Sequence, residues 1–149
     1  ESGGEALADI RVRSAALRGA SFGGEIIPRL IDEIPILAVA ALFADGDTVI
    51  SGAAELRVKE TDRLAAVTAE LNRLAPGAVE AKEDGMVIHG GRMLSPASCR
   101  TYDDHRMAMS LAVAGAAGVG VTLDAPSCVN ISYPSFYQTL DGLVQQGER

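Results

Sequence analysis

An internal repeat limits the folds open to this chain more than any other feature of its sequence. Sliding the sequence along itself by 104 − 32 = 72 residues places Asp32 on Asp104. The further matches are Ala40 on Ala112, Ala44 on Ala116, Gly46 on Gly118, Val49 on Val121, Leu64 on Phe136 and Leu71 on Leu143. Both copies show an aspartate, an apolar helix, a glycine, a strand, a loop and a second helix. This shared order indicates two related units, at about 15–91 and 92–149.

Local patterns predict mixed strands and helices within these units. Alternating or β-branched runs predict strands at 8–13, 47–52, 98–102 and 119–126, and a hairpin over 78–91 turns at Asp84-Gly85. Helices are expected at 32–44, 62–75, 103–118 and 134–146. The order indicates an α/β or α+β fold of repeated βαβαββ-type units, with the last two strands missing from the second unit.

The helices differ in how they should be buried. The helix at 32–44 is apolar all round and should lie in the core, with Asp32 as its N-cap and Pro35 in its first turn. The helix at 62–75 has one apolar stripe, made by Leu64, Val67, Leu71 and Leu74. The last helix should carry Phe136, Leu140 and Leu143 on one face, with Pro134 near its start. Residues 21–25 are expected to form a glycine-bearing turn.

Two charged clusters lie at predicted helix starts. "RVKETDRL" brings Lys59, Glu60 and Arg63 to the start of one helix, and "DDHR" brings Asp104 and Arg106 to the other. A cation in the first turn of a helix costs about 0.3–1 kcal/mol, and a bound anion would remove that cost. Each motif alone also fits an ordinary capped helix start with exposed side chains. Both together favour binding of a carboxylate or phosphate.

Composition narrows the class of protein. The 149 residues are 48% hydrophobic and 22% charged, typical of a globular domain. A net charge of −7 argues against a general nucleic-acid surface. The longest apolar run, 34–44, is too short to span a membrane. Cys99 and Cys128 match no metal-ligand spacing, and without a signal peptide they indicate reduced thiols in the cytoplasm.

The clustered residue types suggest a kind of chemistry. Asp32, Lys59, Glu60 and His105 offer the carboxylates and proton-carrying groups of general acid–base catalysis. No glycine-rich phosphate loop and no metal-ligand spacing occur in the sequence. Carboxylates beside Lys and Arg, without a metal, therefore predict acid–base chemistry on an anionic substrate.

Three stretches carry a resemblance to a known family. "LRVKETDRL", "YDDHRMAM" and "LIDEIPILAVAALFA" resemble the C-terminal part of the 5-enolpyruvylshikimate-3-phosphate synthases, and the resemblance covers essentially the whole chain. It implies a two-lobed fold, each lobe made of three βαβαββ units around buried helices. The chain would be a single partial domain holding about two units of one lobe. The last two strands of that lobe would come from the N-terminal part of the enzyme.

The resemblance also implies a reaction and roles in proton transfer. The 5-hydroxyl of shikimate 3-phosphate adds to C2 of phosphoenolpyruvate, and phosphate leaves from the tetrahedral intermediate. The resemblance implies no metal and no organic cofactor. Asp32 resembles the aspartate at the 5-hydroxyl, and Lys59 resembles the lysine that contacts the same hydroxyl. Glu60 resembles the acid that protonates the methylene carbon of phosphoenolpyruvate.

Other residues resemble the substrate-binding part of the family site. Arg63 and Arg106 resemble the pair that binds the phosphoenolpyruvate carboxylate, with Asp104 and His105 behind them. Ile131 in "CVNISYP" stands where many members have a lysine near the phosphate, so the resemblance does not extend to that contact. The "SYPSF" ending resembles branches of the family without this lysine.

Two further interpretations stay open from the sequence. The same fold could serve as a non-catalytic anion-binding or structural domain, or as part of an enolpyruvyl transferase that acts on UDP-N-acetylglucosamine. If the resemblance holds, these 149 residues should be inactive alone, with Arg63 and Arg106 facing water until the missing lobe is restored.

Overall fold

The computed structural model describes Gly4 and residues 7–147. Its strands are β1 (Ser21–Phe22), β2 (Asp47–Ile50), β3 (Val79–Ala81), β4 (Met86–His89), β5 (Ala97–Cys99) and β6 (Val121–Leu123). Its α-helices are α1 (Ile27–Leu30), α2 (Ile34–Leu42), α3 (Arg63–Leu74), α4 (His105–Ala114) and α5 (Phe136–Gly147). Short 3-10 turns are η1 (Gly24–Ile26), η2 (Ala54–Val58) and η4 (Pro126–Ile131), and η3 (Gly115–Val119) is a π-helical turn.

The first sheet has four strands in the order β1-β2-β4-β3. β1 runs parallel to β2, whereas the predicted hairpin β3–β4 is antiparallel and joins the sheet through β4. Burial alternates along the central strands, so Thr48 and Ile50 of β2 and Met86 and Ile88 of β4 face the core. One face of this sheet is therefore packed and the other is open.

The second sheet repeats the beginning of the first. β5 and β6 are parallel, and α4 connects them as α2 connects β1 and β2. Val121 pairs with Ala97, while Val49 pairs with Ser21, so β2 and β6 differ by 121 − 49 = 72 residues. The first strands differ by 97 − 21 = 76, because η1 and α1 lengthen the first connection. The repeated units are thus present in the fold, and their outer bounds remain a prediction.

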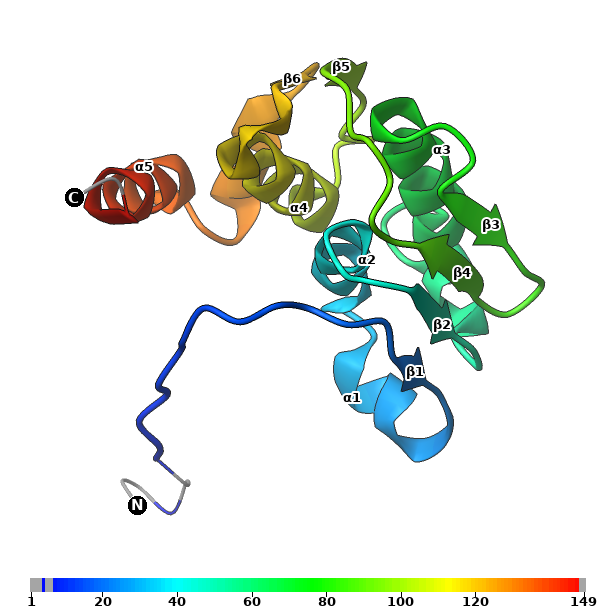
Figure 1. Ribbon diagram of the computed structural model, residues 1–149. Coiled ribbons are helices and arrows are strands. Elements are labelled where there is room, and N and C mark those ends of the chain that lie inside the picture. Colours follow the sequence, from blue (N-terminus) through cyan, green and yellow to red (C-terminus); the bar gives the residue numbers. More distant parts are fainter. Residues whose placement is uncertain (1–3, 5–6, 148–149) are drawn as a thin grey trace.

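Helices α2 and α4 lie side by side in the middle of the molecule, and α3 packs against both of them and against β3 (Figure 1). None of the nine residues of α2 is exposed, as an apolar helix without a polar face predicts. The α3 stripe is confirmed as well, since Leu64, Val67, Leu71 and Leu74 are all buried. The core lies where these three helices meet the first sheet.

Residues 8–13 do not form the predicted strand. Ile10 and Val12 are 88% and 87% exposed, and no described strand pairs with this segment. An alternating sequence forms a strand only where a neighbour takes its backbone hydrogen bonds, and none of the described residues does so here. The strand of this region is instead β1, inside the predicted turn at 21–25.

The last helix forms, but its predicted face is only partly buried. Phe136 and Leu140 are half-buried, whereas Leu143 is 61% exposed. No described element covers Leu143 on that side of α5. Figure 1 shows α5 standing apart from the sheets at one end of the molecule.

Candidate active site

Arg63 is the first residue of α3, and its side chain is completely buried. The helix start itself is capped by Asp62, which accepts a hydrogen bond from the Ala65 amide at 2.9 Å. The guanidinium of Arg63 turns back across this start and donates four hydrogen bonds, all to carboxylates. Carboxylates of this chain thus compensate the misplaced cation.

Asp104 is the most deeply buried of these carboxylates, with no exposed surface. Its Oδ2 accepts from Arg63 Nε at 2.7 Å and its Oδ1 from Nη2 at 3.3 Å, a two-point contact. The same carboxylate caps α4, because Oδ1 also accepts from the amides of Arg106 at 2.8 Å and Met107 at 3.3 Å. Asp104 therefore ties the start of α3 to the start of α4.

Asp32 lies in the turn between α1 and α2 and does not cap α2 as predicted. The N-cap position belongs to Glu33, without a side-chain cap. The Asp32 carboxylate instead accepts from Arg63 Nη1 at 2.8 Å and lies 3.5 Å from Arg106 Nη2 and 3.9 Å from Lys59 Nζ. Asp32 does not cap α2 because three cations interact with its carboxylate instead.

The protonation of Asp32 follows from these neighbours. Partial burial by itself raises the pKa of the Asp32 carboxyl, but the hydrogen bond from Arg63 and the charges of Arg106 and Lys59 outweigh it. The pKa is lowered on balance, so Asp32 is ionised at neutral pH. It can accept a hydrogen bond from a hydroxyl, although it is a weaker base than a free carboxylate.

Lys59 and Glu60 lie between η2 and α3. Lys59 Nζ is 2.8 Å from Glu55 Oε1, and this hydrogen bond is the main reason that its pKa is raised. Glu60 Oε2 accepts from Arg63 Nη2 at 2.7 Å while half of its side chain stays exposed. The cluster therefore presents a protonated lysine and an accessible carboxyl group next to each other.

Arg106 is the more accessible of the two arginines, with 33% of its side chain exposed. Its Nη1 donates to the Asp32 carbonyl at 3.2 Å and to Glu33 Oε1 at 3.4 Å. A hollow of about 200 Å³ opens beside it, between α2 and α4. Its lining comprises Asp32, Glu33, Ile36, Arg106, Met109, Ser110, Val113 and Phe136.

The structure thus brings six of the seven predicted site residues into one connected network: Asp32, Lys59, Glu60, Arg63, Asp104 and Arg106. His105 is half-buried and makes no hydrogen bond or ion pair with the described residues. The prediction that Arg63 faces water is wrong, because three carboxylates enclose it. Sequence reasoning missed Glu55 and Glu33, and only Glu55 had a signal, its i,i+4 spacing from Lys59.

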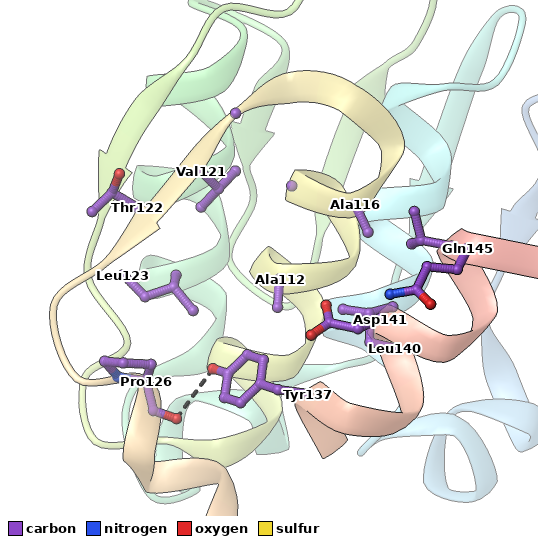
Figure 2. A pocket seen from close by; sticks show the side chains of 13 residues that line it. Ala112, Ala116, Val121, Thr122, Leu123, Pro126, Tyr137, Leu140, Asp141 and Gln145 are labelled. Atoms are coloured by element: carbon purple, nitrogen blue, oxygen red, sulfur yellow. Dashed lines mark hydrogen bonds between the residues drawn. The ribbon is translucent and has the colours of Figure 1, made fainter. Parts of the chain in front are cut away.

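A second hollow, of about 650 Å³, lies away from this network, between α4, β6 and α5 (Figure 2). Apolar side chains dominate its wall, and Tyr137, Asp141 and Gln145 of α5 contribute polar groups. The Tyr137 hydroxyl donates to the Pro126 carbonyl at 3.1 Å. None of the described residues that line this hollow is a cation, so these residues do not suit a small anion.

Other chemistry has little support in the part of the chain that the structure describes. Among those residues no group of three or more His, Cys, Asp or Glu side chains could hold a metal ion. Burial raises the pKa of the Cys99 thiol to about 11, so it is protonated and unreactive. Across the same residues, every helix is too short or too polar to cross a lipid bilayer.

Comparison with known proteins shows which family this chain resembles. The family model of EPSP synthase (3-phosphoshikimate 1-carboxyvinyltransferase) matches residues 3–140. Proteins named 3-phosphoshikimate 1-carboxyvinyltransferase from Desulforudis audaxviator and Gloeobacter violaceus are each 56% identical over 144 residues, which cover 96% of this chain and 33% of theirs. A solved structure of EPSP synthase from Acinetobacter baumannii superposes with a TM-score of 0.76 at 31% identity, over 87% of this chain and 30% of that one.

The matched region includes every residue of the network described above. The chain spans about a third of the length of the curated relatives that it matches. The mixed α/β architecture with its repeated units agrees with the solved relatives. The chain therefore belongs to the EPSP synthase family.

Proposed function

We propose that this chain is the C-terminal part of an enzyme that transfers the enolpyruvyl group of phosphoenolpyruvate to the 5-hydroxyl of shikimate 3-phosphate. The products are 5-enolpyruvylshikimate 3-phosphate and phosphate. The single observation that carries the proposal is the network in which Arg63 joins Asp32, Glu60 and Asp104 beside the accessible Arg106. Family membership and the names of the relatives agree with it.

The two steps of the reaction suggest a role for each charged group in the network. In the first step the 5-hydroxyl oxygen bonds to C2 of phosphoenolpyruvate and passes its proton to Asp32, while the C2–C3 double bond opens and C3 takes a proton to become a methyl group. In the second step the C2–O bond to phosphate breaks, the phosphate takes up the proton held by Asp32, and the methyl carbon returns its proton to Glu60 as the C2–C3 double bond forms again. Glu60, the accessible carboxyl group, is the proton donor to C3. Ionised Asp32 accepts from the 5-hydroxyl, and Lys59 donates to its oxygen.

The two arginines would bind the carboxylate of phosphoenolpyruvate. Four of the five N–H donors of Arg63 are already used by Asp32, Glu60 and Asp104, which leaves one on Nη1. Arg106 therefore makes the principal contact, and Arg63 mainly holds the carboxylates in place. Ile131, 71% exposed at the end of η4, supplies no group for the phosphate.

The cluster alone is too negative to hold an anionic substrate. It contains three cations and five carboxylates, those of Asp32, Glu33, Glu55, Glu60 and Asp104. The net charge is therefore 3 − 5 = −2 when all are ionised. Further cations must come from outside these residues, and we infer that the rest of the enzyme supplies them.

The fold indicates where the rest of the enzyme attaches. β2 pairs with β4 on the side away from β1, but the matching side of β6 has no partner among the described strands. Residues of β6 also line the hollow of about 650 Å³ (Figure 2). We infer that a strand from the rest of the enzyme pairs antiparallel with β6 and that its side chains fill the hollow.

The test is Glu60→Gln in the complete enzyme, followed by phosphate release. The amide keeps the shape and cannot donate the proton, so kcat should fall about 10²–10⁴-fold while both substrates still bind. Glu80→Gln, an exposed change on β3, is the matched control and should leave kcat unchanged. A Glu60→Gln enzyme with near-normal kcat would mean that another group is the acid.

The same assay separates the other interpretations. A complete protein that binds phosphoenolpyruvate but releases no phosphate with any acceptor is a non-catalytic binding domain. Turnover with UDP-N-acetylglucosamine and none with shikimate 3-phosphate would identify the other transferase. The buried, internally paired Arg63 is the one observation that favours a purely structural cluster.

A further inference from the structure

Besides Asp104, Glu70 of α3 is a second fully buried acidic residue, and it lies outside the network just described. It lies seven residues after Arg63, so both side chains leave the same face of the helix. Its Oε1 accepts from the Tyr102 hydroxyl at 2.8 Å, and its Oε2 accepts from the Arg100 amide and from Arg73 Nε, each at 3.0 Å. A buried carboxylate is tolerated because it is fully bonded in this way.

Two of these bonds hold an unfavourable backbone turn. Tyr102 and Asp103 have φ values of 58° and 54°, and they are the only described non-glycine residues with positive φ. Side chains with a Cβ atom avoid this region, so surrounding contacts must impose the two conformations. The Arg100 guanidinium also stacks over the Tyr102 ring, 5.1 Å from its centre.

The other side of the turn is fixed as well. The buried Thr101 donates to Asp124 Oδ1 from its amide at 2.8 Å and from its hydroxyl at 2.9 Å. The Thr101 carbonyl in turn accepts from the Asp104 amide at 3.0 Å. The turn is thus held between α3 and the segment after β6.

This turn leads directly into the candidate active site. Asp104 follows it, binds Arg63 and caps α4, and Arg106 comes two residues later. Helix α3 therefore holds the segment 100–106 by two side-chain contacts, Arg63 with Asp104 and Glu70 with Tyr102. Loss of the Glu70–Tyr102 contact would let the turn relax and move the Asp104 carboxylate and the first turn of α4.

We propose that Glu70 and Tyr102 are positioning residues, which hold the 100–103 turn so that Arg63 and Arg106 keep the geometry needed for the phosphoenolpyruvate carboxylate. Neither contacts the residues assigned to proton transfer, so they act only through Asp104 and α4. The inference rests on the proposed function, because it assigns the effect to phosphoenolpyruvate. Burial, followed by the bond to Glu70, raises the pKa of Tyr102, so its hydroxyl remains a donor at any working pH.

The test compares Tyr102→Phe and Glu70→Gln with Thr68→Val in the complete enzyme. Tyr102→Phe removes one hydroxyl and keeps the ring under Arg100. Thr68→Val, on the same helix, removes one hydroxyl bonded to the Leu64 carbonyl at 2.8 Å and leaves the turn intact. Kinetics are measured with each substrate varied in turn, and the folded fraction of each variant is measured at the assay temperature.

Both test variants should raise KM for phosphoenolpyruvate about tenfold or more, with little change in KM for shikimate 3-phosphate. Their effects should not add in the double variant, because both break the same bond. Thr68→Val should behave as the parent. Hydrogen exchange at the Asp104 amide should quicken in Tyr102→Phe and stay slow in Thr68→Val.

Unchanged KM values in folded Tyr102→Phe enzyme overturn the inference, as does a loss of rate that only follows the unfolded fraction. If Glu70→Gln does not fold, Tyr102→Phe decides alone, since it removes a single atom. An inactive parent enzyme contradicts the proposed function instead. In that case, faster hydrogen exchange at the Asp104 amide still supports the inference that Glu70 and Tyr102 hold the 100–103 turn. Unchanged exchange overturns that inference.

Discussion

At the scale of single residues, Arg63 shows how a cation can occupy a helix start. Its charge opposes the partial positive charge of α3, yet the side chain is fully buried. Asp104 is buried with it, and Asp32 and Glu60 close the outer side. Such a group is costly to break, because removing one partner leaves a buried charge without compensation.

Arg63→Met should therefore lower the stability of the chain strongly. Asp104 would remain buried with only the amide donors of α4, so we expect a loss of about 3–5 kcal/mol in the free energy of unfolding. Urea denaturation followed by circular dichroism measures this loss. Lys82→Met is the control, because it removes only an exposed ion pair with Glu80, which solvent screens.

Equal stabilities of Arg63→Met and Lys82→Met would contradict the assigned burial. Asp104→Asn provides a second measurement, because it keeps the shape and removes the negative charge. It should also destabilise the chain, since the amide cannot accept from both Arg63 and the α4 amides. The two changes together should cost less than their sum, because they break one interaction.

At the scale of elements, the open face of the first sheet has its own ionic contact across three strands. His89 of β4 lies between Asp47 of β2, with Nδ1 2.8 Å from Oδ1, and Glu80 of β3, with Nε2 3.3 Å from Oε1. Lys82 also binds Glu80, at 2.9 Å. These hydrogen bonds, with Asp47 first, raise the pKa of His89 above its usual value.

The contribution of His89 to stability should therefore depend on pH. A raised folded-state pKa means that the stabilisation is fully present below the unfolded value of about 6.5 and is lost as pH rises through the folded value. The melting temperature of the parent should exceed that of His89→Gln at about pH 6, and the difference should shrink by about pH 9. Thermal unfolding of both proteins across this range measures it.

Added salt should reduce the same difference, because the pair is exposed. His105→Gln is the comparison variant, since the His105 ring has no partner among the described residues. Its melting temperature should stay closer to that of the parent than the His89→Gln value does, because this change removes no described contact. A gap between parent and His89→Gln that grows as pH rises would contradict the assigned charge.

At the scale of the whole molecule, three features agree with the proposal that the chain contributes one side of a site. It spans about a third of the length of its curated relatives, its charged cluster carries a net negative charge, and one edge of β6 has no described partner. Residues of β6 line the hollow between α4, β6 and α5, and Leu143 of α5 is exposed. These features agree with a surface that the rest of the enzyme covers.

These 149 residues alone should therefore not release phosphate from phosphoenolpyruvate and shikimate 3-phosphate. In the proposed two-lobed enzyme, closure between the lobes would exclude water and complete the charges around the substrates, and this chain alone would provide neither. Turnover should return when the remaining two-thirds of the enzyme is added or fused. Hydrogen exchange at Val121–Leu123 should slow at the same time, because a new strand protects these amides.

A clear substrate-dependent rate from the isolated chain would contradict the two-lobe proposal. Restored turnover without slower exchange in β6 would keep the function and reject the proposed docking edge. Thr48, already buried in the first sheet, is the internal reference and should exchange slowly in both states.

The sequence by itself determined the elements whose causes are local. α3 follows from the Asp62 cap and one apolar stripe, and β3–β4 follows from two strand patterns around Asp84-Gly85. The 72-residue repeat predicted the second strand–helix–strand unit, because a repeated pattern buries the same face twice. The motifs also named Asp32, Glu60 and Asp104 as neighbours of the arginines.

Only the tertiary structure decided which of these groups are buried. Arg63 binds Asp104, 41 residues away in the sequence, and Asp32, 31 residues away. No local sequence pattern determines that these residues come together. Residues 8–13 have a strand pattern and form no strand, since pairing needs a neighbour as well as a pattern. Burial depends on what lies opposite a side chain, and that is a property of the folded chain.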